Sequence, residues 1–292
     1  MSQQLRWHRR PLRFELLEDR RILAVFSVSN TAEFGSGGLR TAIIEANDTA
    51  GKDEIVFDAS LFGSGTPVIQ LVTQLPVINE PVKIYSETGG DVIIQNAGSV
   101  QKGLFLTPSL GQGISEDFEI SDLVFQDFQY GIHVDHTGGV PNSTLEGVTI
   151  VGNAFFDNER GIYLERPSYP FEIRDNQIFG NLSSSTNPEA GIWIDGTGPV
   201  PNTYGPVIDN NIIVDHEDYG IFVLGAAIVN LAITDNRIGA DGTGAAGPNA
   251  VGILFQGADV QNAVITDNNE IVFNGDGIVV LTPDGIEISV TG

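Results

Sequence analysis

Three carboxylates recur at an even spacing in the middle of the chain, each two residues after an aromatic or imidazole ring. They are Asp135, Glu165 and Asp195, at intervals of 30 residues. The rings are His133, Tyr163 and Trp193, and the next repeat adds Phe222. Rings flanked by acids are typical of sugar sites, because the apolar face of a sugar packs on a ring while its hydroxyls bond to carboxylates. We therefore predict that these rings bind carbohydrate and that the acids are their polar partners.

The same acids also allow catalysis. Glycosidases hold two carboxylates about 5–5.5 Å apart to retain the sugar's configuration, or about 6.5–9.5 Å apart to invert it. A polysaccharide lyase would instead hold Ca²⁺ on the acids while an Arg removes a proton. The catalytic candidates are Asp135, Glu165, Asp195 and Arg166, with Arg160 as a second base, and the Ca²⁺ candidates are the three acids. A metal site of His133, Asp135 and His136 is disfavoured, since neighbouring residues of one strand cannot all face one ion.

These residues belong to a five-residue phrase that returns six times. It begins with Gly-Ile at Gly131, Gly161, Gly191, Gly220, Gly252 and Gly277, which lie 25 to 32 residues apart. Aliphatic residues alternate within each phrase, which is typical of a strand with one buried face. A period of this length with one short strand per repeat indicates a solenoid whose coils bury their apolar sides against one another. The predicted sugar-binding rings then point away from the core, one coil apart.

A second signature precedes each phrase: an aliphatic residue followed three positions later by Asn. The Asn residues are Asn153, Asn176, Asn210, Asn236 and Asn268. Asn tolerates left-handed backbone and bonds to nearby main chain, so it is expected at a sharp bend between two strands of one coil. We predict an all-β chain folded as a parallel β-helix. Leucine-rich repeats are disfavoured because Leu is not found at their fixed offsets.

Resemblances support and extend this prediction. The segment GGLRTAIIEAN (37–47) resembles the SLR-x-AI-x-x-AN motif that opens many bacterial right-handed β-helix proteins, and IGADGTGAAGPN (238–249) is similar to an insertion common in that family. They imply a right-handed, pectate-lyase-like β-helix, a superfamily that includes lyases, hydrolases, esterases, adhesins and tailspikes. At the start of the chain, LLEDRRILA (16–24) resembles the N-terminal export segment of planctomycete surface proteins.

The predicted organisation is a basic export-type arm at 1–28 followed by the β-helix at 29–292, with clear repeats at about 100–282. A short amphipathic helix within about 37–50 is expected to cap the open end of the solenoid, because terminal coils must shield the core. The last residues read as a strand with no cap after it, so we expect further coils or domains to follow in the full-length protein.

Composition limits the classes of partner that the chain can bind. The net charge is −24, with no Cys, and six of the 14 Lys and Arg lie in the first 21 residues. Such an acidic body repels phosphate backbones, which argues against nucleic acid. No apolar run is long enough for a transmembrane helix. We therefore expect an extracellular or cell-surface protein.

Three functions remain open from the sequence. The leading hypothesis is a non-catalytic β-helix module of a surface protein that contacts a polysaccharide or cell-surface glycan. The first alternative is a polysaccharide lyase or glycosidase that uses the same carboxylates. The second is an architectural adhesin or spacer segment, in which the outward row of rings packs beneath loops or a partner. The motifs of polygalacturonases are missing, which weakens the enzyme hypothesis without removing it.

Overall fold

The computed structural model describes residues 23–49, 51–89, 91–107, 118–136, 147–167, 171–180, 188–197, 203–225, 228–257, 260–266, 269–281 and 288–290. Within these ranges the chain has one α-helix, α1 (Leu39–Asn47), and one 3₁₀-helix, η1 (Ala59–Ser64). Neither helix has the length and apolar character needed to cross a membrane. The remaining elements are β-strands.

The strands form three long sheets and one short sheet, here named A to D. Sheet A contains β1 (Val25–Val28), β2 (Asp53–Phe57), β4 (Val82–Ser86), β7 (Phe118–Ser121), β10 (Val148–Val151), β13 (Phe171–Arg174), β17 (Val207–Asp209), β21 (Ala232–Thr234), β25 (Ala263–Thr266) and β28 (Ile288–Val290). Sheet B contains β3 (Val68–Leu71), β5 (Val92–Asn96), β8 (Leu123–Gln126), β11 (Ala154–Phe156), β14 (Gln177–Phe179), β18 (Ile212–Val214), β22 (Arg237–Ile238) and β26 (Glu270–Ile271).

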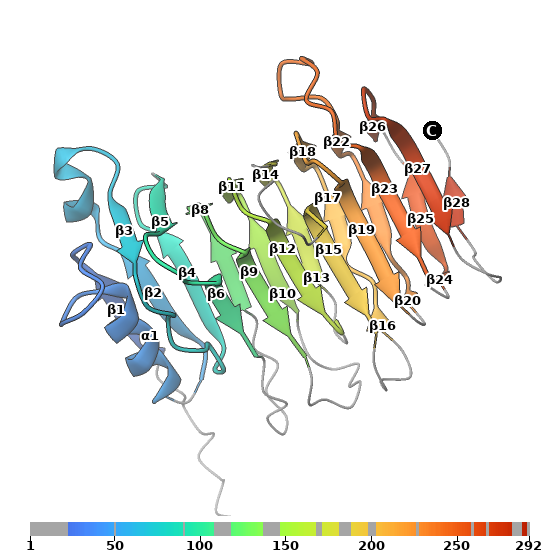
Figure 1. The fold of residues 1–292 in the computed structure, drawn as a ribbon. Helices are drawn as coiled ribbons and strands as arrows, with labels where there is room; N and C mark the ends of the chain where they lie inside the picture. Colours follow the sequence, from blue (N-terminus) through green and yellow to red (C-terminus); the bar gives the residue numbers. More distant parts are fainter. Residues whose placement is uncertain are drawn as a thin grey trace, which may run out of the picture.

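Sheet C contains β6 (Lys102–Leu106), β9 (Tyr130–Asp135), β12 (Arg160–Glu165), β15 (Ala190–Gly196), β19 (Tyr219–Gly225), β23 (Val251–Gln256) and β27 (Asp276–Leu281). Sheet D consists of β16 (Thr203–Tyr204), β20 (Ile228–Val229) and β24 (Val260–Gln261). From β4 to β27 each coil contributes one strand to A, B and C in turn, and the coils stack along one axis from β1 to β28 (Figure 1). The predicted all-β solenoid is confirmed, with about seven turns.

Every strand pair is parallel, and the Gly-Ile phrases lie in register in sheet C. Ile132, Ile162 and Ile192 are direct neighbours in this ladder, and it continues through the later coils. These three side chains have no solvent exposure. Because the apolar ladders of the three long sheets meet along one axis, they form a single continuous core.

The glycine of each phrase has a steric cause. A Cβ atom at Gly103, Gly131, Gly161, Gly191, Gly220 or Gly252 would lie 2.5–2.8 Å from the carbonyl oxygen of the glycine one coil further on. That oxygen belongs to the backbone of a paired strand, so it cannot move aside without breaking the ladder. Gly277 lies in the last strand of sheet C, and a Cβ there would meet no atom within 4 Å.

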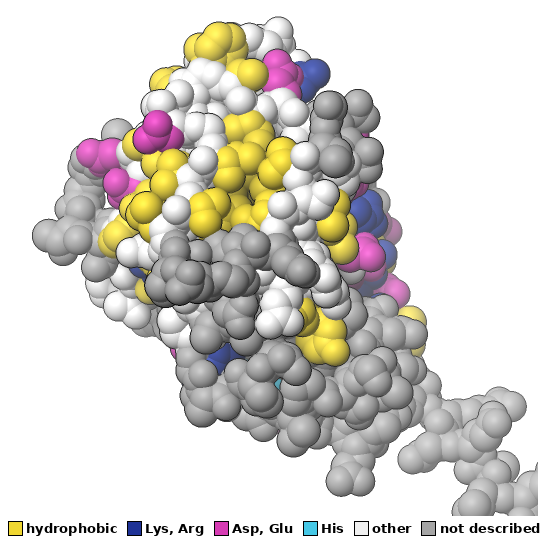
Figure 2. Space-filling model, turned by 90° about the vertical axis from the view of Figure 1, so that its right-hand side faces the viewer, with side chains coloured by type: hydrophobic (Ala, Val, Ile, Leu, Met, Phe, Trp, Pro, Cys, Tyr) yellow, Lys and Arg dark blue, Asp and Glu magenta, His cyan; other side chains and the backbone are white. Residues whose placement is uncertain are grey.

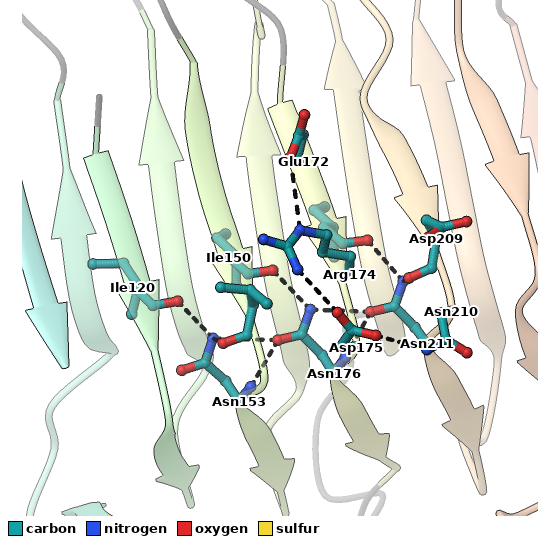
Figure 3. Close-up of polar contacts among 12 residues, drawn as sticks. Ile120, Ile150, Asn153, Glu172, Arg174, Asp175, Asn176, Asp209, Asn210 and Asn211 are labelled. Carbon is teal, nitrogen blue, oxygen red and sulfur yellow. Dashed lines mark hydrogen bonds and ion pairs between the residues drawn. The ribbon is translucent and has the colours of Figure 1, made fainter. Parts of the chain in front are cut away.

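Buried asparagines line the bend between sheets A and B. The Asn176 side chain donates from Nδ2 to the Ile150 carbonyl and to Asn211 Oδ1, and the Asn153 backbone N–H donates to Asn176 Oδ1 (Figure 3). The row continues through Asn236 and Asn269. The predicted asparagine bend is confirmed, and in this coil the buried row runs through Asn211, the neighbour of Asn210. Asn210 is the exposed left-handed residue of the bend, with φ 51°, and Asn211 occupies the buried position. Asn268 lies outside the described residues, and Asn269 completes the row.

The helix α1 lies beside β1 and β2 at the first end of the solenoid (Figure 1). Its buried residues are Leu39, Ala42, Ile43 and Ala46, the face that the sequence pattern predicts. The predicted arm at 1–28 overlaps the fold, because residues 25–28 form β1 and pair with β2. Val28 is fully buried, which explains why the sheet begins before residue 29. Residues 1–22 lie outside the described part.

At the opposite end, hydrophobic side chains gather on the surface of the last coil (Figure 2). Val280, Leu281 and Val290 are 45%, 57% and 61% exposed, although Val280 and Val290 continue the apolar ladders of Phe255 and Ile265. In the strand order, β26, β27 and β28 each pair on one side only.

Candidate functional site

The predicted site residues lie on the outer face of sheet C. His133, Tyr163, Trp193 and Phe222 follow one another in register on β9, β12, β15 and β19. The same row begins at Phe105 and ends at Leu254 and Val279. Trp193, Phe222 and Leu254 form a small apolar cluster separate from the main core. The side of the sheet was therefore predicted correctly from the two-residue alternation.

The rings of this row are packed rather than open. His133, Trp193 and Phe222 are only 5%, 7% and 3% exposed, and Tyr163 is half-buried. The Arg160 guanidinium lies 3.8 Å from the centre of the Trp193 ring, and Phe222 meets that ring edge-on at 4.3 Å. The sugar-stacking role of His133, Trp193 and Phe222 stays a prediction, and in this conformation their ring faces are covered by protein.

The three predicted carboxylates lie one coil apart and are held by neighbouring groups. The Arg166 guanidinium bridges two of them, at 3.2 Å from Asp135 Oδ1 and 2.8 Å from Glu165 Oε1. Tyr163 donates its hydroxyl to Asp195 Oδ2 at 3.1 Å. The repulsion expected between stacked like charges is thus offset by a cation and by hydrogen bonds. Asp135, Glu165 and Arg166 form what we name the charged network.

Arg166 occupies an unusual backbone conformation. Its φ is 54°, in the left-handed region, directly after β12. All other non-glycine residues with positive φ in the described ranges are Asp or Asn, except Phe273. Asp and Asn enter this region readily, whereas a long side chain such as Arg does so at an energetic cost. The turn brings the guanidinium back over the ends of β9 and β12, where it is 19% exposed.

Burial changes the protonation of several groups in the site. Burial, with Lys102 and Arg160 nearby, lowers the pKa of His133 to about 3, so its imidazole is neutral near pH 7. Its Nε2 lies 3.1 Å from Glu165 Oε2. Burial and the neighbouring Asp135 raise the pKa of Glu165 above its usual range. Burial lowers the pKa of Lys102, which faces the same two acids.

A second carboxylate row lies at the other edge of sheet C, and the sequence analysis missed it. Glu159, Glu189 and Asp218 come just before β12, β15 and β19 and are aligned by the bonds of the following backbone amides. Burial and the neighbouring acids Glu217, Asp218 and Glu159 raise the pKa of Glu189 to about 7. The signal was present as an acid two residues before Gly161, Gly191 and Gly220.

Buried histidines should make the fold sensitive to acid. Besides His133, burial lowers the pKa values of His136 and His216 to about 4. Each imidazole stays neutral in the folded chain but takes up a proton on unfolding below about pH 6.5. Their contribution to stability is therefore present above pH 6.5 and is lost as the pH falls toward 4. Glu189 acts in the opposite sense, since its raised pKa makes the folded chain the better proton acceptor between pH 7 and 4.5.

We predict that His216→Asn reduces this acid sensitivity. His216 lies in a row of bend residues that continues through the buried Asn249 and the half-buried Asn274, and its backbone N–H donates to Asn249 Oδ1 at 3.0 Å. The variant should lose about 2 kcal/mol less free energy of unfolding than the parent between pH 7 and pH 4.5. Urea unfolding at both pH values measures the difference. An unchanged drop would contradict the assignment to His216.

Metal binding by the three acids stays a prediction. In the described ranges, no three His, Asp or Glu side chains are grouped in a way that could hold a metal ion. Between Asp135 and Glu165, the positive charge comes from Arg166.

The fold and this site define a class of protein: a parallel β-solenoid with a packed ring row and a charged network on one outer sheet face. The family model described as "right handed beta helix region" matches residues 84–289. The chain belongs to this right-handed β-helix family, which confirms the predicted fold and is consistent with carbohydrate-related or surface roles. No curated protein matches the sequence significantly. The bacterial export segment and the pectate-lyase-like relationship stay predictions.

Proposed function

We propose that the chain is an extracellular or cell-surface β-helix module that contacts a polysaccharide through the charged network of sheet C. The observation that carries this proposal is Arg166, which adopts a left-handed backbone and bridges two acids from adjacent coils. Strained residues concentrate at binding sites, where the surrounding structure holds them in place.

The charged network is suited to hydroxyl-rich ligands. Asp135, Glu165 and Arg166 are 18%, 29% and 19% exposed, so each can reach a ligand while its geometry is fixed by the others. Carboxylates accept and a guanidinium donates several hydrogen bonds, which matches neighbouring hydroxyls of a sugar ring. The packed ring row behind the network then has a supporting role, because it holds the strand ends rigid. The half-buried Tyr163 ring is the member of the row best placed for sugar contact.

One observation favours catalysis as a second candidate. The raised pKa of Glu165 is the property that a glycosidase needs in its general acid, which must hold a proton near its working pH. In this alternative Glu165 is the acid, and Asp135 or Asp195 is the partner carboxylate. Glu165→Gln should then abolish turnover while binding survives. If no turnover is found in the parent, Glu165→Gln should change affinity alone.

We predict that Arg166→Gly weakens polysaccharide binding without unfolding the chain. Glycine adopts positive φ readily, so the variant removes the guanidinium while relieving backbone strain. Losing a charge-assisted contact should raise the dissociation constant about 10- to 100-fold. Isothermal titration with the best ligand from a polysaccharide panel, with and without Ca²⁺, measures this change.

The control variant is Lys83→Ala, which removes another basic side chain that bridges to an acid one coil away, Glu119 on sheet A at 3.1 Å. Its affinity should equal that of the parent. Parent-like binding by Arg166→Gly would overturn the proposal. If the parent binds no polysaccharide, the architectural adhesin or spacer becomes the better hypothesis. The packing of Trp193 and Phe222 agrees with that hypothesis.

A further inference from the structure

A polar hollow lies on the opposite side of the molecule from sheet C, over the bend between sheets A and B. Its volume is about 600 Å³, within the range of small-molecule sites. Four successive coils line it, and its lining residues include Asp175, Gln177, Asn210, Arg237 and Glu270. Asp175 and Asn210 come from neighbouring coils, and Asn210 Nδ2 donates to Asp175 Oδ1 at 2.6 Å (Figure 3). The hollow shares no residue with the charged network.

One wall of the hollow is a turn that is held in place before any ligand arrives. Asp241 Oδ1 accepts from the backbone N–H groups of Thr243 and Ala245, both at 2.8 Å. Arg237 donates to the carbonyl of Gly242 at 2.9 Å, which ties the turn to β22. Preformed sites bind with less ordering cost, so this wall favours a ligand that fits without rearrangement.

An aromatic pair continues the same surface. Gln177 and Phe179 lie two residues apart on β14 and therefore share the outer face of sheet B. Phe179 stacks on Phe156 of the preceding coil, with ring centres 4.9 Å apart and planes within 7°. Both rings are half-buried, so part of each remains accessible. A polar hollow beside partly accessible aromatic rings combines the hydrogen-bonding and apolar contacts that sugars make.

The charges of the hollow select among sugars. Its acids are Asp175, Asp235 and Glu270. The base in its lining is Arg237, whose Nε lies 3.4 Å from Glu270 Oε2, and the adjoining Arg174 places its Nη1 3.1 Å from Asp175 Oδ2, which leaves one acid in excess. The excess negative charge repels uronates and sulfated glycans. Gln177 has an exposed amide with no side-chain hydrogen bond to any described residue, so it can both donate to and accept from hydroxyls.

We propose that this hollow is a second carbohydrate site, which takes a neutral oligosaccharide. Gln177 bonds to its hydroxyls, and the Phe156 and Phe179 pair packs against the apolar face of an adjoining ring. The inference stands apart from the proposed function, because it places binding on sheet B and restricts the ligand to uncharged sugars.

The test is isothermal titration of the whole chain with cellohexaose, xylohexaose, mannohexaose and hexagalacturonate. At least one neutral hexasaccharide should bind the parent. Gln177→Ala and Phe179→Leu should each weaken that binding at least tenfold. Gln177 is exposed, so its variant should fold normally, and Gln70→Ala is the matched control from an exposed glutamine at the far end of sheet B. Gln70→Ala should leave the affinity for the neutral sugar unchanged, and Arg166→Gly is titrated alongside to distinguish this site from the charged network.

Two results would overturn the proposal: no binding of any neutral hexasaccharide, or parent-like binding by Gln177→Ala. Loss of binding in Arg166→Gly alone would place the sugar on sheet C. That result would contradict the second site on sheet B and support the proposed function. Hexagalacturonate binding that depends on Gln177 would contradict the restriction to uncharged sugars.

Discussion

Asn211→Ala is expected to lower the free energy of unfolding by about 4 kcal/mol, among the largest effects of a single substitution in this fold. The Asn211 side chain donates to the carbonyls of Ile173 and Asp209 and accepts from the backbone N–H of Asn176. All of these contacts are buried or partly buried, so alanine leaves several polar groups without partners and without water. Equilibrium urea unfolding of the variant and the parent measures the loss.

The matched control is the neighbouring Asn210→Gly. Asn210 is exposed with positive φ, a conformation that glycine adopts readily, and its side chain bonds only to Asp175 in the described contacts. The control should therefore lower the free energy of unfolding by less than about 1 kcal/mol. Equal losses in the two variants would contradict the placement of Asn211, rather than Asn210, in the buried row.

Gly220→Ala is expected to destabilise the chain by about 3 kcal/mol, because the new methyl group has no space. A Cβ there would lie 2.6 Å from the Gly252 carbonyl oxygen and 2.8 Å from Ile238 Cγ2. Either the parallel pairing of β19 with β23 or the core must shift. Thermal and urea unfolding measure the effect.

The chain supplies its own control for this prediction in Gly277→Ala. Gly277 begins the same phrase, but it lies in the last strand of sheet C and a Cβ there has no close neighbour. Its substitution should change the free energy of unfolding by no more than about 0.5 kcal/mol. If Gly277→Ala is as harmful as Gly220→Ala, the recurring glycines reflect something other than contact between coils.

Much of the fold could be predicted from the sequence because every coil of a solenoid repeats the same local structure. The Gly-Ile phrases predicted the ladders of sheet C, and the face of α1 was predicted residue by residue. The asparagine bend was harder to place, because Asn210 and Asn211 are adjacent and only the backbone conformation shows which one is buried. The N-terminal boundary shifted for a similar reason: a strand as short as β1 has too little pattern to separate it from an arm.

The candidate site was predicted less completely. Alternation places Trp193 and Phe222 on the outer side of sheet C, but it carries no information on what packs over that side, so the sequence left open whether the rings are exposed or covered. The contact of Arg166 with Asp135 and Glu165 depends on a left-handed backbone at Arg166, which no pattern in the sequence indicates. The hollow of sheet B joins residues from four coils, and none of its positions forms a motif on its own.

The most direct test of the proposed function is to incubate the purified chain with a panel of acidic and neutral polysaccharides, with and without Ca²⁺. Binding and the release of reducing or unsaturated ends are read in the same wells. We expect the chain to bind at least one polysaccharide and to release no product. Release of product would contradict the non-catalytic role and favour the enzyme alternative, and absence of binding in every well would contradict polysaccharide contact itself.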